Sequence, residues 1–101
     1  MLYKINNVNF ETNLNFDDII KIVEEYNDKK GKEYEINKKS ILYDTNDIEP
    51  YVINGPVWFV EIISLQIKER WPDAYFFLAI SDIEKRVVYL QNDHGVIVEK
   101  Y

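Results

Sequence analysis

The chain has 101 residues, no cysteine, and 12 Lys and Arg against 18 Asp and Glu, for a formal net charge of −6. A chain of this length buries one hydrophobic core, and its 47 % apolar content favours folding over disorder. We therefore expect a single domain over residues 1–101. The lack of cysteine excludes disulfide scaffolds, cysteine-ligated zinc sites and cysteine nucleophiles within this sequence.

The acidic balance disfavours nucleic acid as a partner, because nucleic-acid binders cluster Lys and Arg to neutralise phosphates. The densest cationic segment, residues 29–39, is interrupted by Glu33 and Glu35 and is interpreted as a solvated helix end. Residues 1–10 lack the apolar stretch of an export signal. The longest uncharged runs fall far below the roughly 20 apolar residues of a membrane span. We expect a cytoplasmic protein with no membrane partner.

The first clear element along the chain is an amphipathic helix over residues 16–30. Asn15 is a favourable N-cap, Asp17 and Asp18 suit the positive end of the helix dipole, and Gly31 is placed to end the helix. Its apolar residues recur at helical spacing: Phe16, Ile19, Ile20, Val23 and Tyr26.

The rest of the chain predicts strands. Residues 57–67 carry the strongest β signal, rich in β-branched and aromatic side chains. Further strands are expected at 74–81, 87–91 and 96–101, with weaker signals at 2–10, 34–36 and 41–43. The predicted fold is α+β, with one N-terminal amphipathic helix packed on a mainly antiparallel sheet of about four to five strands.

No residue pattern predicts catalysis. His94 is the only imidazole, but it lies in Asn-Asp-His-Gly, residues that turns prefer, and we interpret it as part of a hairpin turn. The three glycines form no phosphate-binding loop, and no serine stands in a nucleophile elbow. We expect no enzyme activity, no cofactor and no metal site.

One carboxylate, Glu61, is unusual because it stands among apolar residues in the strongest strand. Burial there would raise its pKa unless a partner offset the cost. Two interpretations stay open: a functional residue, or an edge-facing or salt-bridged side chain.

A more informative feature is the absence of any Lys or Arg between residues 40 and 67, where four carboxylates contribute −4 to the charge. Aromatic rings and carboxylates lie close together in this segment, at Tyr43, Asp44, Asp47, Glu49 and Tyr51. Tyrosine suits protein interfaces, and acidic patches accelerate encounter with basic partners. The alternative is a solvated turn whose tyrosines pack inward. Trp71 is the other interface candidate, with capping of the core as its alternative.

The segment from Trp58 to the end resembles the C-terminal halves of small bacterial toxin-immunity proteins and of PepSY-like domains. The resemblance rests on Trp58 near a strand start, a strand ending in Ser81-Asp82, and the turn that leads into the strand 87–90. Lys85 stands where those families place a glycine, and the match covers less than half of the chain. It implies a single-domain inhibitor that binds and neutralises a cognate toxin, commonly a basic nuclease.

The leading hypothesis is therefore an immunity protein whose acidic, aromatic surface around residues 43–51, extended by Glu61 and Trp71, covers the active site of a toxin. The first alternative is a small ligand-binding or enzymatic domain with a pocket between helix and sheet near Glu61. The second is a phage or plasmid accessory protein that self-associates through the edge strand 96–101. We expect a monomer or a weak homodimer.

Overall fold

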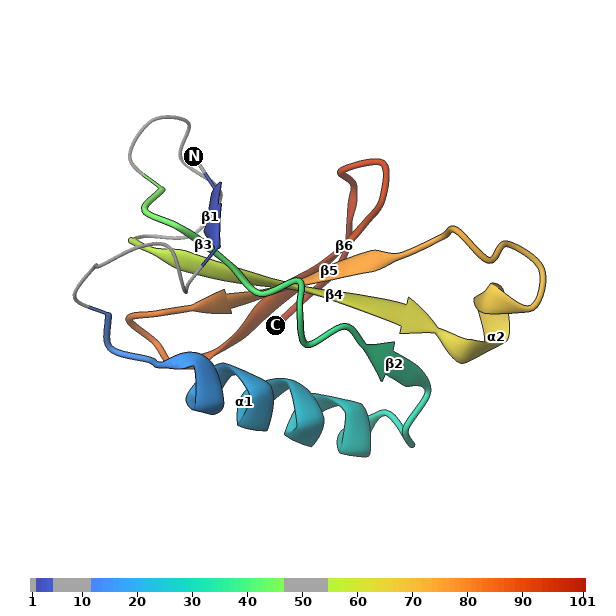
Figure 1. Cartoon of the computed structure of the whole chain (residues 1–101), viewed down its shortest axis with the longest axis horizontal. Helices are drawn as coiled ribbons and strands as arrows, with labels where there is room; N and C mark the ends of the chain where they lie inside the picture. The colour runs from blue at the N-terminus through green and yellow to red at the C-terminus, as the bar shows by residue number, and fades with distance from the viewer. Residues whose placement is uncertain (1, 5–11, 47–54) are drawn as a thin grey trace.

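The computed structural model describes residues 2–4, 12–46 and 55–101, and it has one long helix packed against an antiparallel sheet (Figure 1). The elements follow the order β1 (Leu2–Lys4), α1 (Phe16–Lys29), β2 (Tyr34–Ile36), β3 (Leu42–Asp44), β4 (Val57–Ser64), α2 (Leu65–Lys68), β5 (Phe76–Ser81), β6 (Arg86–Asn92) and β7 (Ile97–Lys100). The predicted α+β class is confirmed.

The sheet has seven strands in the described residues, more than the four or five expected. Its order is β1-β3-β4-β5-β6-β7, and β2 pairs separately with β4. The count is higher partly because β4 is long enough for two short partners to share one edge. β3 pairs with residues 57–59 of β4, and β2 pairs with residues 62–64. The strand β7 lies at one edge of the sheet, as the sequence predicted for residues 96–101.

The helix α1 begins at Phe16, as predicted, and ends at Lys29, one residue before the predicted end. Asn15 caps its N-terminus by accepting a hydrogen bond from the Asp18 N–H at 2.9 Å, and the Asp18 carboxylate accepts one from the Asn15 N–H at 3.0 Å. Gly31 follows the C-cap with a φ of 74°, the left-handed conformation that glycine adopts without steric cost. None of the helices in the described ranges is long and apolar enough to cross a membrane.

The end of β4 differs from the sequence prediction. The strand was expected to continue to Ile67, but it ends at Ser64, and residues 65–68 form the short helix α2. The Ser64 hydroxyl accepts a hydrogen bond from the Ile67 N–H at 3.4 Å, which is an N-cap interaction. This start signal was missed because Leu65 and Ile67 continue the alternation of the strand, and Leu and Ile suit strands and helices alike.

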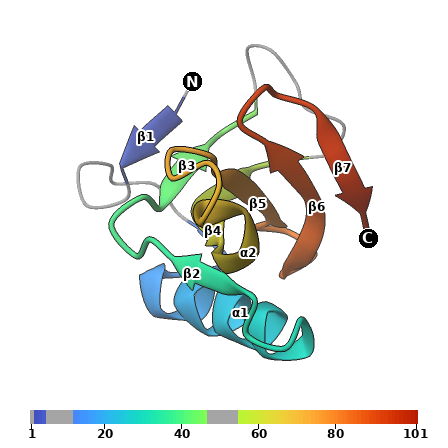
Figure 2. The same cartoon turned by 90° about the vertical axis from the view of Figure 1, so that its right-hand side faces the viewer.

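The two faces of the sheet carry separate apolar clusters. Trp58, Val60 and Ile62 of β4 pack with Ile19 and Val23 of α1 in the larger cluster. The intervening positions Val57 and Phe59 belong to a second cluster, with Ala79, Val88 and Tyr89, on the face turned away from α1. Figure 2 shows α1 beneath the sheet, with β7 at one side and β1 at the other.

Candidate functional site

The structure places two members of the predicted acidic, aromatic surface in the interior. Tyr43 is 3 % exposed and Asp44 is 2 % exposed. The Tyr43 ring packs edge-on against Trp58 at 5.0 Å between ring centroids, and the Asp44 carboxylate accepts a hydrogen bond from the Asn46 N–H at 2.8 Å. Their burial follows from the position of β3 between β1 and β4. This differs from the exposed surface that the sequence predicted for these two side chains.

The other three residues of that surface, Asp47, Glu49 and Tyr51, lie outside the described residues.

Glu61 is half-buried and is held by the turn that follows β2. Its carboxylate accepts a hydrogen bond from the Asn37 side-chain amide at 3.1 Å, and its backbone N–H donates to the Ser40 hydroxyl at 2.8 Å. Because side chains alternate along β4, Glu61 shares the face of Phe59 and points away from α1. It therefore does not line a space between helix and sheet, which was the basis of the ligand-pocket alternative.

Trp71 lies on the surface, with 59 % of its side chain exposed. Its N–H donates to the Ile67 carbonyl at 2.8 Å, and its own carbonyl accepts from the Ala74 N–H at 3.1 Å. The Arg70 guanidinium lies 5.3 Å from the centre of the indole ring. The alternative that Trp71 caps the core is wrong.

We call residues 65–73 the α2 tip. Figure 1 shows α2 and the loop after it at one end of the long axis of the molecule. Leu65 and Trp71 are exposed apolar side chains of the α2 tip, which also carries the exposed carboxylates of Glu69 and Asp73. Lys68 forms an ion pair with Glu35 of β2 at 2.7 Å, which ties α2 to the neighbouring strand.

Asp82 is a buried carboxylate that sequence reasoning treated only as a turn residue. It is 2 % exposed and accepts hydrogen bonds from the Leu14 N–H at 3.0 Å, the Asn13 N–H at 2.9 Å and the Trp58 indole N–H at 2.9 Å. We call these four residues the Asp82 knot. It joins the entrance of α1 to the turn between β5 and β6, and this architectural role accounts fully for its burial.

A hollow of about 340 Å³ lies between the second half of α1 and the start of β6; we call it the α1–β6 groove. Four cationic side chains line it: Lys29, Lys30, Lys85 and Arg86. Ile22, Val87 and the rings of Tyr26 and Tyr101 contribute apolar surface, and Glu25 contributes a carboxylate. Sequence reasoning did not find this site, because its residues come from three separate parts of the chain.

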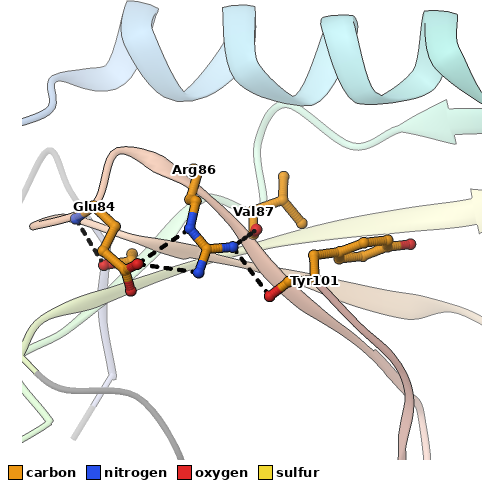
Figure 3. Close-up of polar contacts among 5 residues, drawn as sticks. Glu84, Arg86, Val87 and Tyr101 are labelled. Atoms are coloured by element: carbon orange, nitrogen blue, oxygen red, sulfur yellow. Dashed lines mark hydrogen bonds and ion pairs between the residues drawn. The ribbon is translucent and has the colours of Figure 1, made fainter.

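Arg86 is fixed by a set of contacts at the edge of this groove (Figure 3). Its Nε and one terminal nitrogen donate to the same Glu84 carboxylate oxygen at 3.1 and 3.0 Å. The other terminal nitrogen donates to the Tyr101 carbonyl at 3.0 Å and the Val87 carbonyl at 3.3 Å. These contacts hold the start of β6 against the residue that follows β7.

A tyrosine cluster closes the other end of the groove. The hydroxyls of Tyr26 and Tyr101 lie 2.8 Å apart, and the Tyr101 hydroxyl also donates to Glu99. The Lys30 ammonium forms an ion pair with Glu99 at 3.1 Å and lies 5.7 Å from the centre of each of the two rings. Burial raises the pKa of both tyrosines, so their hydroxyls stay protonated at neutral pH.

His94 is an exposed part of the turn between β6 and β7, as predicted. The Asn92 side-chain oxygen accepts hydrogen bonds from the His94 N–H at 2.9 Å and the Val96 N–H at 3.0 Å, and Gly95 has a φ of 81°. Within the ranges that the structure describes, no three His, Asp or Glu side chains gather as metal ligands would.

Comparisons with known proteins provide no relatives for this site. No protein-family model matches the chain, and no curated protein and no solved structure is significantly similar to it.

Proposed function

We propose that this chain is a binding protein of the toxin-immunity kind, which docks on a partner protein through the α2 tip with Trp71 as its anchor. The observation that carries the proposal is a large aromatic side chain that is 59 % exposed on a backbone held by two hydrogen bonds. Tryptophan is among the residues that contribute most to protein interfaces. A fixed backbone lowers the entropy lost on binding.

Folding provides no reason for a tryptophan at position 71. The side chain contributes little to the core at this exposure, and the hydrogen bonds of its backbone would form with any residue other than proline. Leu65 is a second exposed apolar side chain of the same tip.

The charge of the chain supports a basic partner. The net charge is −6, and residues 40–67 contain four carboxylates and no cation. A partner with a basic active site, such as a nuclease that binds phosphates, would be attracted to this field and would associate faster at low salt. Inhibition then requires no chemistry, because the bound chain covers the active site.

The test is to measure, by isothermal titration calorimetry, the affinity of the chain for a basic nuclease toxin domain encoded next to it in the genome. We expect a tight complex, and we expect Trp71→Ala to weaken it by about 2 kcal/mol or more, roughly 30-fold, as for interface anchors. The matched control is Val96→Ala, which removes an equally exposed apolar side chain from the turn between β6 and β7. The affinity of the Val96→Ala variant should stay within about threefold of that of the unchanged protein.

A charge test separates the acidic segment from the anchor. Asp44 is buried, so its reversal would disturb the fold, and only Asp47→Lys combined with Glu49→Lys is informative. We expect this double variant to bind more slowly at low salt and to lose most of the salt dependence of association.

No complex with the toxin, or equal affinity for the Trp71 and Val96 variants, would contradict the proposal. Size-exclusion chromatography with mass measurement adds a further check. A stable dimer abolished by changes in β7 would favour self-association through the open edge of the sheet instead.

A further inference from the structure

We propose that the α1–β6 groove binds a small organic anion, with a carboxylate or phosphate head on an apolar body. This site is separate from the α2 tip and does not depend on the function proposed above. Its volume of about 340 Å³ lies at the lower end of the range for small-molecule sites.

The groove has an apolar side on which the body of such a ligand would rest. Ile22 of α1 and Val87 of β6 are half-buried there. The rings of Tyr26 and Tyr101 meet edge-on at 5.8 Å between centroids, and their hydroxyls bond to each other. These rings are therefore held in place before any ligand arrives.

Two of the four cations that line the groove are already neutralised. Lys30 is paired with Glu99 and packs against both tyrosine rings. Arg86 directs its guanidinium to Glu84 and to the Tyr101 carbonyl, as Figure 3 shows. These two cations build the wall of the groove and leave little charge for a ligand.

The other two, Lys29 and Lys85, form no ion pair with the side chains described in residues 12–46 and 55–101. They come from different elements, the last turn of α1 and the turn before β6, and both line the same hollow. Glu25 is the one carboxylate in that lining. An anion placed between the two ammonium groups would gain two charge-assisted contacts.

Lys85 has a φ of 57°, in the left-handed region where glycine is free of strain and a lysine is not. Lys32, which does not line the groove, has a φ of 59°. The backbone conformation therefore belongs to the turn, and the case for a ligand depends on the lining of the groove and on its two lysines.

The test is a titration of the isotopically labelled full chain with phenyl phosphate and with benzoate, followed by NMR. Inorganic phosphate and phenol serve as the head alone and the body alone. We expect saturable shifts at Ile22, Val87 and Tyr101 for at least one of the two whole anions, and at least about tenfold weaker binding of either fragment. The relative affinities of phenyl phosphate and benzoate distinguish a phosphate site from a carboxylate site.

The variant Lys29→Gln combined with Lys85→Gln should weaken binding about tenfold or more. The matched control is Lys38→Gln combined with Lys39→Gln, which removes two exposed lysines from the turn after β2 and should leave binding unchanged. Both variants should keep the NMR spectrum of a folded chain.

Three results would overturn the proposal: no saturable binding of either whole anion, equal weakening by the two double variants, or inorganic phosphate binding as tightly as phenyl phosphate. The last would indicate an adventitious ion only.

Discussion

The two tryptophans of this chain lie in regions of opposite character. Trp58, in the Asp82 knot, is fully buried between α1 and the sheet, whereas Trp71, in the α2 tip, is 59 % exposed. The Trp58 indole N–H donates to a buried carboxylate, while Trp71 is contacted on its ring by the exposed Arg70. The same side chain therefore stabilises the fold in one region and is available for a partner in the other.

A tryptophan is buried where the fold provides both apolar neighbours and an acceptor for its N–H. At position 58 the strand provides the neighbours, and Asp82 provides the acceptor. At position 71 the chain runs through a short loop of charged and polar residues after α2. We therefore expect changes in the Asp82 knot to alter stability and changes in the α2 tip to alter binding.

The largest effect on stability is expected from Asp82→Ala. This change removes one acceptor shared by three donors and leaves the Trp58 N–H and the Leu14 N–H buried without a partner. Each such donor costs about 1–3 kcal/mol, so we expect the free energy of unfolding to fall by about 3–5 kcal/mol. Urea denaturation, monitored by circular dichroism, measures this free energy of unfolding. Asp73→Ala, on the exposed loop, is the control and should change stability by less than about 0.5 kcal/mol. A loss below about 1 kcal/mol for Asp82→Ala would refute the importance of the knot.

Trp58→Phe should have the next largest effect. It removes the indole N–H from Asp82 and leaves a void in the larger apolar cluster, at a cost of about 2 kcal/mol. The remaining tryptophan, Trp71, should then show red-shifted fluorescence that acrylamide quenches readily. Blue-shifted, protected emission from this variant would contradict the exposure of Trp71.

A smaller effect of the opposite sign is expected from Lys85→Gly in the turn that carries Asp82. The φ of 57° costs a lysine about 1 kcal/mol relative to glycine, so we expect the variant to be more stable by about 0.5–1 kcal/mol. Glycine also gives the unfolded chain more entropy, which reduces the gain. The same variant should bind phenyl phosphate more weakly, because a groove cation is lost. Lys38→Gly, in an exposed turn, is the control and should show no gain in stability.

The smallest effect on stability is expected from Trp71→Phe, within about 0.5 kcal/mol, because the ring is largely exposed. In this variant Trp58 is the remaining fluorophore, and its emission should be blue-shifted and protected from acrylamide until the protein unfolds. If Trp71→Phe destabilised the chain as much as Trp58→Phe, the contrast between the two regions would be wrong.

Local patterns predicted much of this fold. The cap at Asn15, the apolar spacing of α1 and the glycine after it correctly predicted the helix, and the turns at 82–85 and 92–95 correctly separated the last strands. These signals work because capping and turn formation involve residues close together in the chain. The weak strand signal at 34–36 corresponds to β2, although no local pattern showed that it pairs with the free end of the β4 edge. The helix α2 was missed, because it depends on a single Ser64 cap in a segment that was expected to be strand.

The candidate functional regions were predicted less well, because they depend on contacts between residues far apart in the chain. Trp71 was predicted as an interface candidate or a cap on the core, and the structure shows that it is exposed. Tyr43 and Asp44 were expected at the surface because they adjoin polar turn residues, yet β3 lies inside the sheet and buries them. The α1–β6 groove was missed, because the residues of the Tyr26–Tyr101 contact that closes it lie 75 positions apart.

The class of the fold, the position of its helix, its acidic charge and its lack of cysteine chemistry could be predicted, since all of these depend on composition or on neighbouring residues. The folded chain was needed to show which tryptophan is buried, which carboxylate forms the knot and which lysines lack an ion pair among the described side chains. Those outcomes depend on contacts between distant segments, such as Leu14 with Asp82, and no local pattern encodes the position of both partners.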